Sequence, residues 1–200
     1  MADSRHDERV ELTQKGEVLV LVTEAQREIR QAYIGGFVGQ LVSAALWLTS
    51  AVLATWGTPR AAIILLVIGG MFIFPATLLG LRLVRRRATV SPGNPLNALG
   101  TQVALVLPLS LPVVGAATLY RLDWFFPAFM IVVGAHYLPF VFLYGMRMFG
   151  VLCGILVAGG IVLALYGPPI FAAGAWITAA ILFVFALLGR RIVDRELAEA

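Results

Sequence analysis

Residues 148–166 read MFGVLCGILVAGGIVLALY and contain no charged side chain. A helix rises about 1.5 Å per residue, so about 20 residues cross a bilayer core of about 30 Å. This run is therefore typical of a transmembrane helix. The sequence contains six apolar runs of comparable length, which are residues 33–56, 61–83, 96–119, 124–144, 148–166 and 170–189.

The segments between the runs are short and consist of turn formers or charged residues, such as Gly167-Pro168-Pro169. Consecutive helices must therefore be antiparallel neighbours, and the runs lack the polar–apolar alternation of membrane β-barrel strands. The sequence predicts an all-α fold, a polytopic membrane protein with a six-transmembrane-helix bundle and an N-terminal amphipathic helix. The predicted parts are a charged cytoplasmic or interfacial arm (1–32), the transmembrane domain (33–189) and a short cytoplasmic tail (190–200).

The composition favours the same class of protein. Of the 200 residues, 60% are hydrophobic and 13% are charged, whereas soluble domains carry about 25% charged residues. The mean hydropathy of +0.91 excludes a disordered tail, and the single cysteine, Cys153, cannot form an intrachain disulfide. Membrane topology accounts for the 15 Lys and Arg residues, so no nucleic-acid partner is expected.

The distribution of positive charge predicts the orientation in the membrane. With the N-terminus in the cytoplasm, 13 of the 15 Lys and Arg residues lie on the cytoplasmic side, and only Arg60 and Arg121 lie outside. Cytoplasmic loops of multi-pass proteins carry such an excess of Lys and Arg. Both termini are therefore predicted to be cytoplasmic.

The arm before the first run carries apolar residues on one helical stripe, opposite charged residues. The stripe consists of Val18, Leu21, Val22, Ala25 and Ile29. This pattern predicts a helix that lies at the membrane interface or docks on the bundle. A short strand over residues 18–22 is the alternative.

Carboxylates are almost absent from the apolar part of the chain, because Asp123 is the only one between Glu28 and Asp194. Pumps and transporters usually place Asp or Glu inside the helix bundle. The sequence therefore argues against a carboxylate-coupled antiporter, an acid pair for catalysis and a metal site. It predicts no cofactor, and it favours a protein without enzymatic activity.

Polar residues gather in the hairpin of the third and fourth runs. Pro108 and Pro112 are expected to interrupt the third helix and Pro139 the fourth, while Pro75 adds a kink in the second. The polar side chains either tie the helices together by hydrogen bonds or line a ligand pocket that opens to the cytoplasm. The candidate pocket residues are His136, Tyr137, Tyr144, Arg147, Asn97 and Gln102.

Two further sets of residues are candidates for contacts outside the core. A basic cluster can attract anionic lipid headgroups, at about 1 kcal/mol per residue, or act only as a topology anchor. It consists of Arg82, Arg85, Arg86 and Arg87. Small residues spaced by four predict close helix packing, within one subunit or in a homo-oligomer. They are Gly35, Gly39 and Ser43 in the first run, and Gly150, Gly154 and Ala158 in the fifth.

Three segments of the hairpin carry a resemblance to known sequences. They are SPGNPLNALG (91–100), GAHYLPF (134–140) and YGMR (144–147). This part of the chain, about residues 91–147, resembles a family of uncharacterised small bacterial multi-pass membrane proteins that is classed only as a domain of unknown function. The resemblance implies a bacterial inner membrane, and it supplies no activity, substrate or catalytic residue.

Three classes of function remain open from the sequence. The first is a small carrier or channel-like protein with a polar pocket between the third and fourth helices. The second is a structural or accessory membrane protein that acts through helix association. The third is an intramembrane enzyme or a receptor for a lipid-like ligand, with His136 as its acid–base group. The expected partners are membrane lipids, a second copy of the chain and a small or lipid-like ligand.

Overall fold

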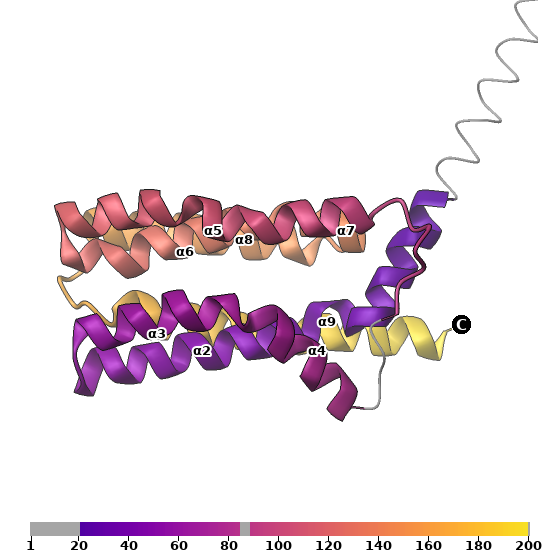
Figure 1. Ribbon diagram of the computed structural model, residues 1–200, viewed down its shortest axis with the longest axis horizontal. Helices are drawn as coiled ribbons and strands as arrows, with labels where there is room; N and C mark the ends of the chain where they lie inside the picture. The colour runs from indigo at the N-terminus through magenta and orange to yellow at the C-terminus, as the bar shows by residue number, and fades with distance from the viewer. Residues whose placement is uncertain (1–20, 85–88, 200) are drawn as a thin grey trace, which may run out of the picture.

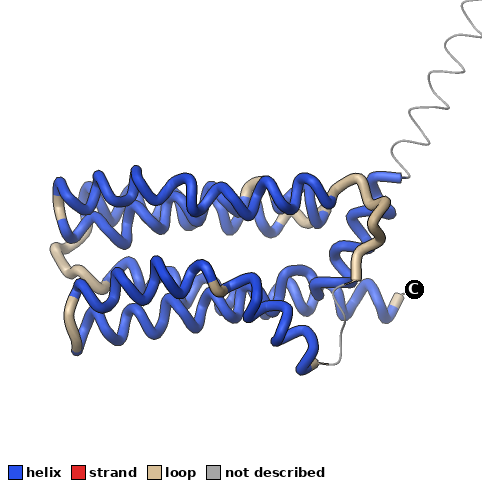
Figure 2. The backbone as a smooth tube through the Cα atoms, viewed as in Figure 1, coloured by secondary structure: helices blue, strands red, loops and turns tan. Residues whose placement is uncertain are grey.

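The computed structural model describes residues 21–84 and 89–199, and all regular elements in these ranges are helical (Figures 1 and 2). The first is a helix over residues 21–33, which we call the arm helix. The elements that follow are η1 (Ile34–Gly36), α2 (Phe37–Trp56), α3 (Pro59–Met71), α4 (Ile73–Leu83), α5 (Asn97–Tyr120), η2 (Leu122–Trp124), α6 (Phe125–Tyr137), α7 (Phe140–Tyr144), α8 (Met148–Tyr166) and α9 (Ala173–Ala198).

Within the described ranges, five helical segments are long and apolar enough to cross a membrane. They are Leu21–Trp56, Asn97–Tyr120, Leu122–Tyr144, Met148–Tyr166 and Ala173–Ala198. The bent pair of α3 and α4 meets the same criteria when its two helices are taken together, which makes six. The prediction of an all-α polytopic bundle is therefore confirmed.

The helices form two layers (Figure 1). One layer contains α2, α3, α4 and α9, and the other contains α5, α6, α7 and α8. Aromatic rings connect the layers, since the Trp47 ring of α2 lies 5.5 Å from that of Phe129 and 6.0 Å from that of Phe126. The arm helix, residues 89–96, residues 145–147 and the C-terminal end of α9 lie at the same end of the bundle, which we call the arm end.

Two of the predicted proline kinks are real breaks, and each has a local cause. The bend between α3 and α4 is 63°, and Pro75 removes the donor that would bind the carbonyl of Met71, the last residue of α3. Similarly, α6 ends at Tyr137 before Pro139. The carbonyl of Ala135, which Pro139 leaves without its helical donor, accepts instead from the Leu138 N–H at 3.1 Å.

The third helix differs from expectation. Pro108 and Pro112 lie inside α5, which stays one continuous helix from Asn97 to Tyr120. A membrane helix tolerates proline where the remaining backbone hydrogen bonds hold its turns together. The prolines of α5 therefore do not open the helix.

The two ends of the chain meet at the arm end through close backbone packing. Ile34, Gly35 and Gly36 all have positive φ, so the chain bends between the arm helix and α2. A Cβ atom on Gly35 would lie 2.9 Å from Val193 and 3.1 Å from the Gly189 carbonyl, both on α9. Only glycine at position 35 satisfies this bend and this contact together. Because α9 continues to Ala198, most of the predicted tail (190–200) is part of that helix.

Close packing of α6 on α8 depends on Gly134 and Gly160. A Cβ atom on Gly134 would lie 3.0 Å from the backbone N of Val157, and one on Gly160 would lie 2.7 Å from the Pro127 carbonyl. By contrast, Gly154 is exposed and has no atom within 4 Å of a Cβ position. The glycines that join these two helices were therefore not the ones that the four-residue spacing singled out.

The remaining small-residue candidates lie on several surfaces. Ala158 is exposed on α8, like Gly154. Gly39 faces Thr77 of α4, with 3.5 Å between the Cβ position and the Thr77 hydroxyl, and Gly150 faces Val141 at the same distance. Ser43 lies next to the Tyr137 side chain of α6. The first run thus contacts three different elements through Gly35, Gly39 and Ser43.

Substitution of Gly160 by leucine should destabilise the protein, because the side chain would push α6 away from α8. Overpacking of this kind costs about 1–3 kcal/mol. Gly154→Leu is the matched control on the same helix and should leave the melting temperature unchanged. Thermal unfolding in detergent checks both variants, and an equal loss of stability for the two would contradict the assigned faces of α8.

Candidate functional site

The most extensive set of polar contacts in the described chain lies at the arm end, on the arm helix. One face of this helix is apolar, and its residues Ala25, Ile29 and Ala32 are buried. Polar residues of the same helix bind three separate parts of the bundle: the segment before α5, the α7–α8 turn and the C-terminal end of α9. The predicted amphipathic helix is therefore docked on the bundle, and residues 18–20 of its alternative strand lie outside the described ranges.

Glu28 anchors the segment that precedes α5. Its carboxylate accepts hydrogen bonds from the backbone N–H of Ser91 at 2.7 Å, from the Ser91 hydroxyl, and from the Asn94 amide at 2.7 Å. The Asn94 amide also donates to the carbonyl of Ala25 at 3.1 Å. The hydrogen bonds from the Ser91 hydroxyl, the Asn94 amide and the Ser91 N–H hold the pKa of Glu28 below its usual range.

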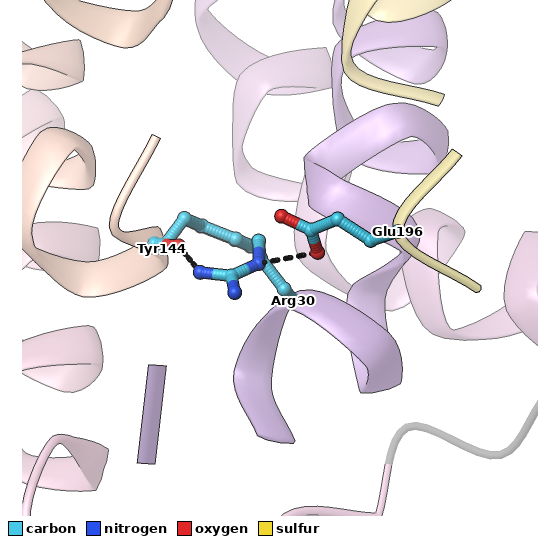
Figure 3. A network of polar contacts seen from close by, with 3 residues as sticks. All are labelled: Arg30, Tyr144 and Glu196. Carbon is cyan, nitrogen blue, oxygen red and sulfur yellow. Dashed lines mark hydrogen bonds and ion pairs between the residues drawn. The ribbon is translucent and has the colours of Figure 1, made fainter. Parts of the chain in front are cut away.

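Arg30 joins the two layers (Figure 3). Its Nε donates to Glu196 of α9 at 3.0 Å, and its Nη1 donates to the backbone carbonyl of Tyr144 at the end of α7. One turn earlier, the Gln26 amide donates to the carbonyl of Phe142. Carbonyls at the end of a helix lack donors in a following turn. Arg30 supplies a donor to the Tyr144 carbonyl, and Gln26 adds a second donor to the Phe142 carbonyl, which also accepts from the Gly145 N–H at 3.3 Å.

An open hollow of about 480 Å³ lies beside this ion pair, lined by Arg27, Arg30, Glu196 and Glu199. Two guanidinium groups and two carboxylates face it, so neither sign of charge dominates. Its openness makes it a surface depression rather than an enclosed pocket. We therefore treat the hydrogen-bonded set of Gln26, Glu28 and Arg30 as the candidate functional site and call it the arm clamp.

The candidate pocket of the sequence analysis is divided by the structure. Tyr137 and Tyr144 are buried in an aromatic cluster that also contains Phe140, Phe149 and the His136 ring. The centres of neighbouring rings in this cluster lie 5.1 to 6.0 Å apart. The His136 ring lies 5.7 Å from the Tyr137 ring and 5.1 Å from the Phe140 ring, and its Nδ1 is buried without a described partner. These three residues therefore lie within packed helix contacts.

The other three pocket candidates are exposed. Asn97 donates to the carbonyl of Ser91 at 2.9 Å at the start of α5, and Gln102 and Arg147 are exposed. The structure brings His136, Tyr137 and Tyr144 close together but shows no described hollow that they share with Asn97 or Gln102. Their role as a ligand site stays a prediction.

Of the basic cluster, only Arg82 lies in the described part of the chain. It is exposed in the last turn of α4, at the arm end. Arg85, Arg86 and Arg87 lie outside the described residues. Binding of anionic headgroups by this cluster likewise stays a prediction.

Two features escaped the sequence analysis. The first is the arm clamp, because its partners Ser91, Phe142 and Glu196 are far from the arm in sequence. The second is Gln40, which is 2% exposed and has no described partner for either atom of its amide. Gln40 was visible in the sequence as the only amide side chain in the first apolar run. Among the described residues, no group of three His, Cys, Asp or Glu residues could hold a metal ion.

The fold and the site define a multi-pass helical membrane protein whose arm helix ties its two layers together at one end. Residues 22–190 match the family of unknown function DUF7010, and the chain belongs to that family. The match extends well beyond the predicted resemblance over residues 91–147 and includes the arm clamp. No curated protein and no solved structure matches the chain.

The lowered pKa of Glu28 predicts how arm docking depends on pH. A carboxyl group with a lowered pKa in the folded state stabilises that state above its ordinary value, here 4.5, and loses this effect as the pH falls through the lowered value. The arm should therefore stay docked at neutral pH and loosen only below 4.5. Spin labels on Glu24→Cys and Thr89→Cys, in a Cys153→Ala background, report the distance between the arm and the α4–α5 segment.

The matched control is Glu28→Gln, which has no carboxyl group to protonate. Its distance distribution should show no transition near the pKa of Glu28, while other acidic groups remain unchanged. An identical acid transition with and without Glu28 would show that another group controls the docking.

Proposed function

We propose that this chain is a structural or accessory membrane protein that acts through protein contacts at its arm end, with both termini in the cytoplasm of a bacterial cell. The arm clamp carries this proposal. Gln26, Glu28 and Arg30 use their hydrogen-bonding groups to assemble the arm end from three parts of the chain. With the arm docked, this end presents a surface on which another protein, or a second copy of the chain, can bind.

The chemistry of the spanning helices favours this function over ion-coupled transport. The only carboxylate between Glu28 and Asp194 is Asp123, which pairs with Arg121 at 2.6 Å at the opposite end of the bundle. Proton and sodium pathways usually need an acidic group within the membrane. Some predicted pocket residues, such as Tyr137, are buried in helix contacts, whereas others, such as Gln102, are exposed. This separation also favours an accessory protein over a transporter.

A small carrier or channel-like protein is the second candidate, and one observation favours it. Gln40 is a polar group buried within a membrane-spanning helix, and its amide has no described partner. Polar groups in such positions often mark the path of a solute. The pocket of this candidate would then lie at α2 rather than between the third and fourth predicted helices.

Native mass spectrometry of the protein released from detergent separates the two candidates. An accessory protein should appear as a defined assembly of two or more copies, or with a stoichiometric protein partner. Arg30→Gln should weaken that assembly, because Arg30 holds the arm end together. A monomer with one retained small solute would instead contradict the accessory function and favour the carrier.

The orientation follows from the charges at the two ends. Among the described residues, Arg27, Arg30, Arg82, Arg147 and the three arginines of the last turns of α9 belong to the arm end. At the opposite end, Arg60 and Arg121 are the described cations, and Arg121 is paired with Asp123. The excess of positive charge supports a cytoplasmic arm end, where Arg82 could meet anionic lipid headgroups.

Cysteine labelling in intact cells tests this orientation. Thr58 and Thr89 are both exposed, in segments at opposite ends of the bundle. In a Cys153→Ala background, a membrane-impermeant maleimide should label Thr58→Cys and leave Thr89→Cys unlabelled until the cells are opened. The reverse pattern would place the termini outside the cytoplasm.

A further inference from the structure

Among the described residues, Gln40 is the one whose side chain has two buried polar atoms without a hydrogen-bond partner. It is 2% exposed, and neither its amide nitrogen nor its oxygen has a described partner. A primary amide can donate two hydrogen bonds and accept two. Burial of the amide without any of these hydrogen bonds is unfavourable. Either a bound molecule supplies the missing hydrogen bonds, or the protein has another state in which water hydrates the amide.

Gln40 lies in the seam between the two layers. Gly36, Gln40, Ser43 and Trp47 are spaced by four, three and four residues, so they share one face of α2. Within one turn of Gln40 on this face, a Cβ atom on Gly36 would lie 3.3 Å from Phe149, and Ser43 lies next to the Tyr137 side chain. Trp47 meets Phe129 further along. The face of α2 that carries Gln40 therefore meets α6 and α8 of the other layer.

The arm helix closes this seam at the arm end. Arg30 donates to Tyr144, in the layer of α6 and α8, and pairs with Glu196 on α9, in the layer of α2 (Figure 3). A Cβ atom on Gly36, one helical turn from Gln40, would lie 3.9 Å from the Tyr144 ring. The backbone carbonyl of the same tyrosine accepts from Arg30, so Arg30 holds the two layers together at the end of the seam where Gly36 and Tyr144 meet.

The connection between the arm helix and α2 is suited to movement. Ile34 has a φ of 52°, a conformation that a β-branched residue rarely adopts, and Gly35 and Gly36 follow with φ of 59° and 79°. Strain of this kind persists only where surrounding contacts maintain it, and it clusters in segments that change conformation. Here the contacts that maintain it are those of the arm clamp and of Gly35 with α9.

We infer that Gln40 is a binding site for a small neutral hydrogen-bonding solute, water in the simplest case, and that the arm helix covers this site until the arm clamp is released. The side chains of the seam set the class of solute. Ser43, Tyr137, Tyr144 and Trp47 are neutral, and Arg30 at the end of the seam is already paired with Glu196, so a charged solute would lose its hydration without gaining a counter-ion. This inference goes beyond an accessory function, because it assigns a solute and a moving part to the bundle.

Thiol labelling at position 40 tests the inference. The protein is placed in nanodiscs as a Cys153→Ala, Gln40→Cys variant, and its reaction with the neutral reagent hydroxyethyl methanethiosulfonate is followed by intact mass. Labelling should be slow with the arm clamp intact and about tenfold faster or more in Arg30→Gln, since a hydrogen bond to a charged group stabilises by more than a neutral one. Arg30→Lys keeps the charge beside Glu196 and should give an intermediate rate.

Two controls keep the result specific. Thr178→Cys, at a fully buried position of α9, reports general loosening of the bundle and should not accelerate in Arg30→Gln. Glu28→Gln releases the arm from Ser91 without touching Tyr144 or Glu196, and it serves if Arg30→Gln does not fold. Equal rates at position 40 with and without the clamp, or equal acceleration at position 178, would overturn the inference.

The amide itself is tested at a neighbouring position. In the Arg30→Gln background, Ser43→Cys should react severalfold more slowly when Gln40 is also replaced by methionine, because an apolar side chain gives the solute no partner. Unchanged labelling of Ser43→Cys in the presence of Gln40→Met would show that the seam opens without a site at Gln40.

Discussion

The structure depends on one constraint of the bilayer, which is that hydrocarbon offers no hydrogen-bonding partner to a backbone or a side chain. The spanning helices satisfy their own backbone groups, and most strongly polar side chains lie at the two ends. The ends of helices are where this rule is hardest to meet, because their last carbonyls have no donors in the same helix. At the arm end, Gln26 and Arg30 supply donors to the carbonyls of Phe142 and Tyr144.

The arm helix can supply those donors because the chain bends sharply at Ile34–Gly36 and brings the helix across the end of the bundle. The bend is fixed by packing as well as by backbone conformation, since Gly35 contacts Gly189 and Val193 of α9. The first and last helices are thus held together next to the hydrogen bonds that tie the arm to the other layer. The family match includes the arm helix from residue 22 onward.

The buried amide of Gln40 is the exception to the same constraint. It belongs to the face of α2 on which the two layers meet, between Gly36, which admits the Phe149 ring, and Ser43, which lies next to Tyr137. Packing of rings such as Phe149 and Trp47 surrounds this face with apolar surface. A single polar group within such a seam is unfavourable without a water molecule to bind it. The arm clamp at the end of the seam determines whether water can reach Gln40.

The sequence by itself determined the helical class, the multi-pass architecture and the amphipathic arm, because these follow from the length and polarity of single segments. It also located the breaks near Pro75 and Pro139, where a missing N–H acts on its own helix.

Tertiary structure decided which glycines pack: Gly134 and Gly160 join α6 to α8, while Gly154 faces outward. It also decided that Tyr137 and Tyr144 pack with Phe149, whereas Asn97 and Gln102 are exposed. Spacing along one helix shows which residues share a face, but the rotation of that face toward a neighbour depends on contacts between segments distant in sequence.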